Sequence, residues 1–569
     1  MVLNHRLLVF LFIVLTSSVV TAQGGRIPVP AENGMVASSH YLASKVGRNI
    51  LEKGGSAVDA SVATAFALAV TLPSAGNIGG GGFLVYHGEN GEATTFNFRE
   101  KAPLAATVDM FLDENGKVKD NSNHEGLLSV GVPGTVSGLY KAHQKFGKLD
   151  WAVLLQPAIE LAENGIPSSM RNQNFLIWLK ENKEEYPSTG RAFLKNGTEI
   201  YKVGEIWKQP DLAESLKRIR DNGPAGFYEG KTAKLIADFM KNNGGIIGLE
   251  DLKKYQATEA KPVKGTYRGF DIIAMPPPSS GGVAVVEMLN ILEGFDLKAS
   301  GANSAATLHY LTEAMRRAFA DRALFLGDPK FNPNMPLAKL ISKEYAKKLR
   351  ETIQEGKASV SDSANFSQAH LAYESPETTH ISVVDKEGNA VSLTYTLEQS
   401  YGSKIVVEGA GFLLNNEMGD FNPIPGYTDT QGYIGTAPNL VEPEKQMLSS
   451  MSPTIIAKDG KPILVIGSPG GRTIINTVLQ IISNVIDHEM DIAKAIESPR
   501  IHHQWLPDET RFESWGFSRD TEEIYKEMGH KIEYRTSQGR VMGIYIDWEN
   551  SMIYGAADSR SYDGEALGY

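Results

Sequence analysis

The sequence of 569 residues contains no cysteine. Disulfide bonds, thiol nucleophiles, cysteine-ligated metals and lipid attachment to cysteine are therefore excluded. Positive charge is also scarce, because 56 lysines and arginines stand against 67 acidic residues and give a net charge of −11. This balance disfavours nucleic acid as a partner. The 12 histidines are scattered, and their spacing predicts no metal site.

Apolar runs long enough to span a bilayer are missing too. His5 and Arg6 precede an apolar run at residues 7–15, and the small residues at 20–22 offer a cleavage site. We expect residues 1–22 to be a signal peptide and the mature chain to be exported, either periplasmic or secreted. A membrane anchor is the alternative, which the short apolar run disfavours.

Helix and strand patterns are mixed along the whole chain. Apolar residues make up 42% of the sequence and are interspersed, and no low-complexity linker divides it. We therefore expect one large α/β body or two interlocked layers. The expected elements are helices at 38–53, 56–70 and 474–486, a hairpin at 83–87 and 94–99, and a helix-rich middle from 135 to 350.

The chain changes character between Glu377 and Thr378. Residues 356–377 are polar, lack helical or strand periodicity and include Pro376, whereas the residues after Thr378 alternate like a strand. A threonine with a free α-amine carries its own general base, because that amine titrates near about 7.7–8.0. We predict that the chain cuts itself at the Glu377–Thr378 bond and that Thr378 becomes a nucleophile.

The strand pattern after Thr378 also predicts a register. Residues 386–388 form a three-residue hairpin loop with a glycine available for positive φ. Pairing across this loop sets Ile381 against Leu393 on a buried face, and the same register places Thr378 opposite Thr396. A slip of one residue would pair apolar with polar positions, so burial selects the first register. Thr396 is therefore the candidate for orienting the Thr378 hydroxyl.

Residues 467–471 read GSPGG and lie between an apolar strand pattern at 463–466 and a helix pattern that begins near Arg472. Backbone N–H groups at such a helix N-terminus suit a developing oxyanion. A tight turn in which the glycines merely fit is the alternative, and the motif alone leaves both open.

Glu417 and Asp420 lie three residues apart after an apolar run at 411–414. A solvated loop would explain them. The functional alternative is a pair of carboxylates that binds an ammonium group.

Together these segments resemble the γ-glutamyltransferase (γ-glutamyltranspeptidase) family of N-terminal nucleophile hydrolases. The resemblance runs nearly end to end, and several motifs in the right order are far more specific than any one alone. The motifs are residues 54–60 (GGSAVDA), 76–83 (GNIGGGGF), 98–103 (FREKAP), 132–134 (VPG), 275–282 (MPPPSSGG), 320–322 (ADR), 378–385 (TTHISVVD), 415–421 (NNEMGDF), 448–454 (LSSMSPT) and 467–471 (GSPGG).

The resemblance implies an α/β fold, a four-layer αββα sandwich that two self-cleaved subunits build jointly. The large subunit would be residues 23–377 and the small subunit residues 378–569. The implied activity cleaves the γ-glutamyl amide of glutathione and related compounds through an ester on Thr378. The acyl group then passes to water or to amino acid and dipeptide acceptors. No cofactor, metal, nucleic acid or stable membrane anchor is expected.

The resemblance also assigns the chemistry to four positions. Thr378 is the nucleophile both for self-cleavage and for attack on the γ-carbonyl. Thr396 is the supporting threonine, in agreement with the hairpin register. Gly470 and Gly471 form the oxyanion hole.

Five further positions bind the amino acid end of the substrate in this family. Arg99 clamps the α-carboxylate, a task for which its planar fork of donors is suited, and Ser449 and Ser450 add hydroxyls. Glu417 and Asp420 hold the α-ammonium group. Fixing both charges would place the γ-carbonyl at the nucleophile while the rest of the substrate varies.

Two features depart from the family pattern. Glu398 occupies a position where many relatives carry Asn; its carboxylate could still contact the ammonium group. Residues 423–447 are long enough to form a lid, but Gln431 stands where the closing aromatic is expected and Tyr433 lies nearby. Because a leaky lid admits water, the balance between hydrolysis and transfer stays open.

Three other functions are alternatives. A glutaryl or cephalosporin acylase would not need an ammonium-binding pair, so Glu417 and Asp420 argue against it. A second relative processes poly-γ-glutamate. A non-catalytic exported protein that binds glutamate-like ligands is disfavoured by the intact Thr378 and its hydroxyl partner.

Overall fold

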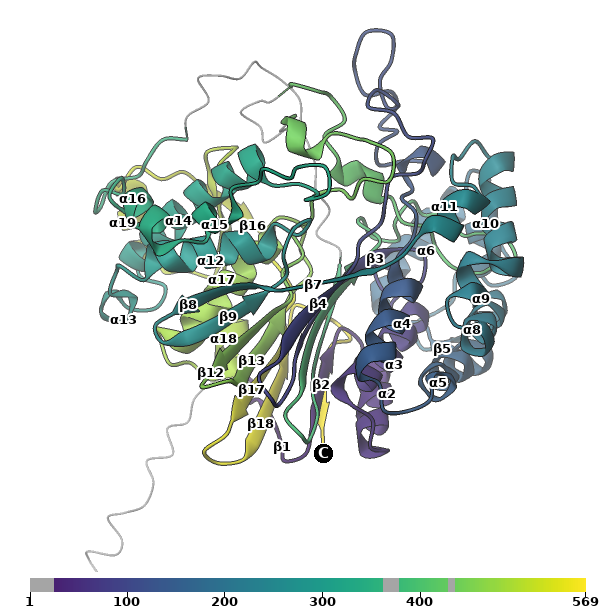
Figure 1. The fold of residues 1–569 in the computed structure, drawn as a ribbon, viewed down its shortest axis with the longest axis horizontal. Coiled ribbons are helices and arrows are strands. Elements are labelled where there is room, and N and C mark those ends of the chain that lie inside the picture. The colour runs from purple at the N-terminus through teal and green to yellow at the C-terminus, as the bar shows by residue number, and fades with distance from the viewer. Residues whose placement is uncertain (1–24, 362–377, 428–434) are drawn as a thin grey trace, which may run out of the picture.

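The structure is a computed structural model that describes residues 25–361, 378–427 and 435–569. Within these residues, two seven-stranded antiparallel sheets lie face to face, and helices cover the outer face of each (Figure 1). The predicted αββα sandwich is confirmed. Its assembly from two cleaved subunits stays a prediction.

The first sheet, called the β10 sheet, combines segments from both sides of the predicted cleavage point. Its order is β19 (Glu565–Gly568), β2 (Met35–Ser38), β10 (Thr379–Val384), β11 (Ala390–Thr396), β3 (Gly81–His87), β4 (Ala93–Phe98) and β7 (Thr258–Ala260). Strands β10 and β11 follow Thr378, whereas β2 and β3 beside them precede it. The two segments therefore share backbone hydrogen bonds across the centre of one sheet.

The predicted hairpin register is confirmed. Strands β10 and β11 pair Ile381 with Leu393 and Thr379 with Tyr395. These partners leave Thr378 opposite Thr396, one residue beyond the last paired position.

The second sheet, called the β13 sheet, faces the first. Its order is β1 (Val29–Ala31), β18 (Met552–Ala557), β17 (Met542–Asp547), β13 (Lys461–Gly467), β12 (Thr454–Lys458), β9 (Phe270–Ala274) and β8 (Val263–Tyr267). Smaller sheets join β14 (Ile501–His502), β15 (Thr510–Glu513) and β16 (Ile532–Arg535), and β5 (Ile166–Pro167) with β6 (Ile206–Trp207).

In the described part of the chain, six helices cover the outer faces of the two sheets. Helices α2 (Tyr41–Glu52), α3 (Ala57–Thr71) and α4 (Thr135–Phe146) pack on the β10 sheet. Helices α12 (Gly281–Leu292), α17 (Thr473–Ile486) and α18 (Ile492–Glu497) pack on the β13 sheet. Every residue of α3 is buried, because its alanines allow neighbouring elements to approach from all sides.

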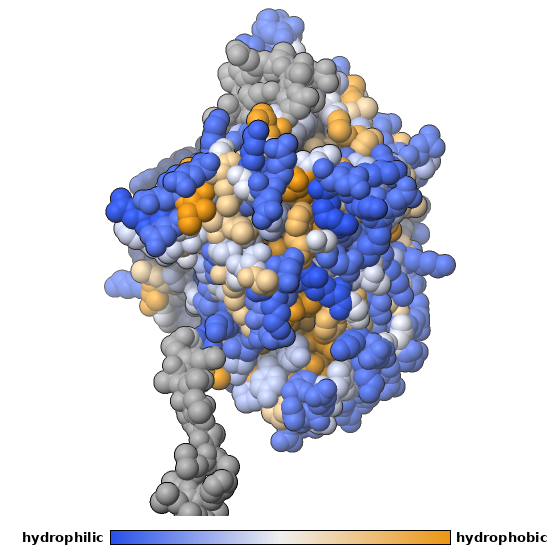
Figure 2. Space-filling view, turned by 90° about the vertical axis from the view of Figure 1, so that its left-hand side faces the viewer, coloured by the Kyte–Doolittle hydropathy of each residue, from blue (hydrophilic) through white to orange (hydrophobic). Residues whose placement is uncertain are grey.

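The other helices form the periphery. They are α5 (Trp151–Asn164), α6 (Gln173–Glu181), α7 (Pro187–Phe193), α8 (Pro210–Asn222), α9 (Ala225–Tyr228), α10 (Gly230–Asn242), α11 (Leu249–Lys254), α13 (Leu297–Ser300), α14 (Ala305–Phe325), α15 (Leu337–Leu340), α16 (Lys343–Arg350) and α19 (Arg519–Glu527). Helix α14 packs against α12 and α19. Figure 2 shows a face on which hydrophilic side chains predominate and apolar ones form smaller patches between them.

The elements expected from the sequence are present with small shifts at their ends. The helix expected at 38–53 begins at Tyr41, because His40 has extended backbone angles and its ring accepts a hydrogen bond from the Leu42 amide. The helix expected at 56–70 is capped by a reciprocal pair between Ser56 and Asp59. No helix in the described ranges is long and apolar enough to cross a bilayer.

Candidate active site

The candidate nucleophile Thr378 lies just before β10 and is 5% exposed. Its Oγ1 donates a hydrogen bond of 3.3 Å to Oγ1 of Thr396, as the register predicted. Thr396 Oγ1 in turn accepts a 2.9 Å hydrogen bond from the Glu398 amide. The end of β11 therefore holds one hydroxyl in contact with the Thr378 hydroxyl.

The alternation of β10 decides which way Thr378 points. Ile381 belongs to the apolar core under α2 and α3, whereas His380 and Ser382 face the β13 sheet. Residues of even number in this strand share one face, so the Thr378 side chain points toward the β13 sheet as well. The loop that leaves β13 lies on that side.

His380 fills the space between the two sheets and was not singled out from the sequence. Its Nδ1 lies 2.8 Å from Oγ1 of Thr394, and a Cβ added to Gly467 would lie 2.3 Å from its ring. Burial lowers the pKa of His380 to about 3, so the ring is neutral. A neutral ring thus packs β10 against the residue where the glycine turn begins.

The glycine turn connects β13 to α17. Gly470 has φ +140° and Gly471 has φ +56°, values that L side chains rarely adopt. The turn is fixed by Thr473, whose Oγ1 donates a 2.7 Å hydrogen bond to the Gly470 carbonyl. The backbone geometry therefore requires glycines here. This requirement is compatible with both interpretations that the sequence left open.

Arg99 is fully buried. It lies at the centre of a charged wall that it forms with Glu417 and Asp420. Its guanidinium forms ion pairs with Glu417 and with Asp420, both in the 3₁₀ helix η4 (Glu417–Asp420). Its Nε also donates a 3.3 Å hydrogen bond to the Met447 carbonyl. The position expected to bind a carboxylate and the positions expected to bind an ammonium group thus meet each other directly.

This pairing has an electrostatic cause. Isolated charges are costly in a buried site, so a guanidinium and carboxylates that face one cavity pair with each other. Burial raises the pKa of Glu417 well above its ordinary value, although Arg99 opposes this shift. A zwitterionic ligand would offer each of these charges a new partner of the opposite sign.

Ser449 and Ser450 are held by the ADR and PPPSSGG motifs. The Ser280 hydroxyl donates a 2.7 Å hydrogen bond to the Ser449 carbonyl. Arg322 in α14 donates 2.9 Å hydrogen bonds to the hydroxyls of both Ser280 and Ser450. Arg322 was noted only as part of a motif, because nothing in the sequence shows that α14 reaches the site.

Glu398 lies beside His124, which was also not predicted. The Nδ1 atom of His124 is 3.2 Å from Oε1 of Glu398, and a Cβ added to Gly419 would lie 2.2 Å from that same nitrogen. Glu398 has φ +77°, an uncommon angle for a non-glycine residue. His124 therefore lies between Glu398 and η4, and it comes from a loop without periodicity.

One cavity collects these side chains. Of the predicted site residues in the described ranges, Gly470 alone is not among those that line it, although its neighbour Gly471 is. The lining residues are Arg99, Thr378, Thr396, Glu398, Glu417, Asp420, Ser449, Ser450, Met451, Gly471 and Ile474. Glu377 and the lid positions Gln431 and Tyr433 lie outside the described residues.

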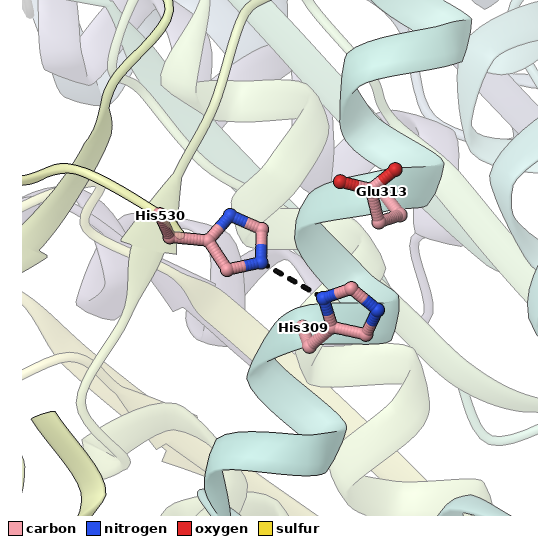
Figure 3. A group of neighbouring side chains, drawn as sticks. All are labelled: His309, Glu313 and His530. Carbon is pink, nitrogen blue, oxygen red and sulfur yellow. Dashed lines mark hydrogen bonds between the residues drawn. The ribbon is translucent and has the colours of Figure 1, made fainter. Parts of the chain in front are cut away.

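A second polar cluster consists of His309, Glu313 and His530, in which one nitrogen or oxygen atom of each residue lies within 4.8 Å of those of the other two (Figure 3). Residues of these types can bind a metal, but here the atoms that would do so on His309 and Glu313 already form hydrogen bonds. His309 Nε2 lies 3.0 Å from the Gln354 carbonyl, and its Nδ1 lies 2.8 Å from Nε2 of His530. Arg317 donates to Glu313. The cluster fits a buried polar network better than a metal site.

Comparison with known proteins identifies the family. The model of the family described as Gamma-glutamyltranspeptidase matches residues 43–569. The chain belongs to this family. Among curated members, the Escherichia coli (strain K12) "Glutathione hydrolase proenzyme" is 45% identical over 544 residues, which are 95% of this chain and 93% of that protein. The resemblance found from the sequence motifs is thereby confirmed.

Solved structures of gamma-glutamyltranspeptidase relatives agree with the fold. The cephalosporin acylase from Bacillus halodurans has a TM-score of 0.84 at 27% identity and covers 96% of this chain and 98% of its own. Helicobacter pylori gamma-glutamyltranspeptidase has a TM-score of 0.56 at 46% identity and covers 59% of this chain and 94% of its own. This member of the family is therefore an enzyme with the N-terminal nucleophile hydrolase architecture.

Proposed function

We propose that this enzyme cleaves the γ-glutamyl amide of glutathione and related compounds and passes the acyl group to water or to the amine of an amino acid or dipeptide. One observation carries the proposal. Thr378 and the charged wall of Arg99, Glu417 and Asp420 line the same cavity. A γ-glutamyl group carries a zwitterion at one end and the scissile amide at the other, and this cavity offers a partner to each.

The first half of the reaction uses Thr378 as an N-terminal residue. Its α-amine accepts the proton from its own Oγ1, and the oxygen attacks the γ-carbonyl carbon. The amides of Gly470 and Gly471 are proposed to donate to the oxyanion that forms. The tetrahedral intermediate then collapses, the C–N bond breaks, and the leaving amine takes the proton. A γ-glutamyl ester on Thr378 remains.

The second half transfers the acyl group. Water or an acceptor amine attacks the ester carbonyl, the α-amine of Thr378 takes a proton from the attacking atom, and this proton returns to Oγ1 as the ester bond breaks. Hydrolysis and transfer therefore differ only in the attacking atom. Which of them prevails depends on access of water to the cavity, where residues 423–447 are proposed to act as a lid.

The free α-amine requires processing of the chain, so we infer self-cleavage at the Glu377–Thr378 bond. The products would be a large subunit of residues 23–377 and a small subunit of residues 378–569. Because strands from both segments share the β10 sheet, the two products would stay together without a covalent link. The curated E. coli relative is named a proenzyme, which supports this proposal. Removal of residues 1–22 and export to the periplasm or the medium are proposed with it.

The second candidate is an acylase that acts on an acyl group without an amine. The similarity to the B. halodurans cephalosporin acylase is the observation that favours it. Such an acyl group would bring no cation to the acidic side of the cavity. Glu398, Glu417 and Asp420 all line that cavity, so an acyl group that carries an ammonium fits it better.

Mass spectrometry of the purified protein, followed by product release from a γ-glutamyl anilide with and without glycylglycine, tests the proposal. We expect two fragments whose smaller member begins at Thr378, release of the aniline, and faster release with glycylglycine if transfer contributes. An uncleaved chain that hydrolyses the anilide would contradict the processing step. A processed chain that cleaves glutaryl amides but not γ-glutamyl amides would contradict the proposed substrate class.

A further inference from the structure

Glu100 is a buried carboxyl group for which the proposed reaction has no role. It follows Arg99 in the chain and is fully buried, and neither of its carboxyl oxygens has a hydrogen-bond partner in the described part of the chain. Buried polar atoms are rarely left in this state, and each such atom calls for an explanation. Oε2 of Glu417, in the neighbouring charged wall, is likewise buried without a hydrogen-bond partner among the described residues.

The backbone approaches Glu100 closely at two glycines. A Cβ on Gly81 would lie 2.6 Å from Oε2 of Glu100, and a Cβ on Gly131 would lie 2.9 Å from its Cβ. Arg99 Nη1 is 3.7 Å from Oε2 of Glu100, while the same nitrogen pairs with Oε1 of Glu417. Glu100 and Glu417 thus approach one guanidinium nitrogen from two sides.

Carboxyl groups outnumber cations around Arg99. One guanidinium faces the carboxyl groups of Glu100, Glu417 and Asp420, and the first two are fully desolvated. Two carboxylates that share a buried site cannot both ionise without a large cost, so one of them retains a proton. A proton held between Glu100 and Glu417 would also place a hydrogen bond on two of the three oxygens for which the described residues supply no donor.

We propose that Glu100 and Glu417 share one proton beneath Arg99, and that Glu100 is a positioning residue that limits this pair to one negative charge when the donor binds. This inference rests on the proposed γ-glutamyl function and deepens it. With the proton in place, Glu417 can accept the α-ammonium group while Arg99 turns to the α-carboxylate. Loss of the proton adds a negative charge beside Arg99 and repels that carboxylate.

The other groups that face Glu100 do not supply the missing donor. Tyr228 donates its hydroxyl to the Pro133 carbonyl, and Tyr255 donates its hydroxyl to the Arg99 carbonyl. Asp420 and Glu398 are the other titratable groups that line the cavity, and His124 lies beside Glu398. Burial raises the pKa of Glu100 to about 8, while Arg99 opposes the shift, which supports a retained proton at neutral pH.

The direction of the pH effect follows from that shift. The native state binds the extra proton between the ordinary pKa of 4.5 and about 8, so the contribution of this group to stability falls as pH rises through this range. The amide in Glu100→Gln mimics the protonated acid and does not titrate. The free energy of unfolding of the variant, minus that of the wild type, should therefore increase as pH rises.

The test combines stability with kinetics. We expect the melting temperature of Glu100→Gln, relative to wild type, to increase steadily from about pH 5 to about pH 8. For a γ-glutamyl anilide, the donor KM of the wild type should rise several-fold more than that of the variant over the alkaline half of this range. Glu287→Gln is the matched control, because Glu287 is equally buried in α12, and burial also raises its pKa well above the ordinary value. Its KM profile should follow that of the wild type.

Parallel KM profiles and parallel stability curves in wild type and Glu100→Gln would overturn the proposal. If Glu100→Gln does not fold, infrared difference spectra test for the shared proton. They are recorded on the Glu287→Gln enzyme, because burial raises the pKa of Glu287 as well and its carboxyl group would add a second band. The carbonyl band of a protonated carboxylic acid should be lost as pH rises through about 8, and its absence at neutral pH would overturn the proposal. Because the stability and infrared measurements need no substrate, the acid pair can hold even where the proposed function fails.

Discussion

Two buried polar clusters join the segments that precede and follow Thr378, and they differ in how their charges are matched. In the cavity, Arg99 meets three carboxyl groups, and the described residues supply no donor to either oxygen of Glu100 or to Oε2 of Glu417. In the cluster of His309 and His530, Glu313 pairs with Arg316 and Arg317, and Asp508 supplies a second carboxylate to Arg316. Both rings are neutral because burial lowers their pKa values. A surplus of one sign marks the cluster that is arranged for a ligand, and a matched set marks the one that stabilises the fold.

Thr378→Ala tests the first cluster with the largest effect. We expect a single full-length polypeptide and no γ-glutamyl release, because the alanine lacks the hydroxyl needed for both steps. Gel electrophoresis under denaturing conditions and an anilide assay measure these outcomes. Two fragments from this variant would refute self-cleavage by Thr378, and the wild type purified in parallel is the control.

Arg99→Lys should raise the donor KM far more than it lowers kcat. Lysine keeps the charge but loses the planar fork, so a charge-assisted hydrogen bond worth about 1.5–3 kcal/mol disappears from the bound state, roughly ten- to a hundredfold in KM. Steady-state kinetics with a γ-glutamyl anilide measure both constants. An unchanged KM would show that Arg99 does not bind the donor carboxylate.

Glu313→Gln should act on stability instead of binding. Removing one partner of a buried ion pair costs about 3–5 kcal/mol. Burial opposes ionisation of Glu313, but hydrogen bonds from Ser359 and the two arginines lower its pKa to about 2. Its contribution is therefore present above the ordinary pKa of 4.5 and lost as pH falls toward 2.

Thermal unfolding measured at several pH values tests this assignment. The gap between wild type and Glu313→Gln should be widest at neutral pH and should close as the solution is acidified. The donor KM of the variant should stay at the wild-type value. A raised KM with an unchanged melting temperature would remove the distinction between the two clusters.

Chelation should have the smallest effect. Because hydrogen bonds occupy His309 on both ring nitrogens and Arg317 pairs with Glu313, treatment with EDTA is expected to change neither activity nor melting temperature. A fall in melting temperature that zinc restores would instead make this cluster a metal site.

The sequence predicted local features well. The pairing of Ile381 with Leu393, and with it the position of Thr396, followed from alternation and one hairpin loop, because burial of one face fixes the register of a strand. The glycine turn also followed from the order of strand, glycines and helix. Both features depend on residues that are close together in the chain.

Features that depend on distant segments were missed. His124 and Arg322 reach the cavity from a loop and from α14, and neither has a periodicity that shows this. The sequence assigned opposite ends of the substrate to Arg99 and Glu417, but not their direct contact. That contact arises because both side chains are desolvated together, which only the folded chain determines.

The central claim is that Thr378, freed by self-cleavage, carries the γ-glutamyl group. Peptide mapping by mass spectrometry of enzyme quenched during turnover of a γ-glutamyl anilide tests it most directly. We predict a γ-glutamyl adduct on the peptide that begins at Thr378 and lies at the N-terminus of the smaller fragment. An adduct on another residue, or turnover by a chain still intact across the Glu377–Thr378 bond, would contradict the account.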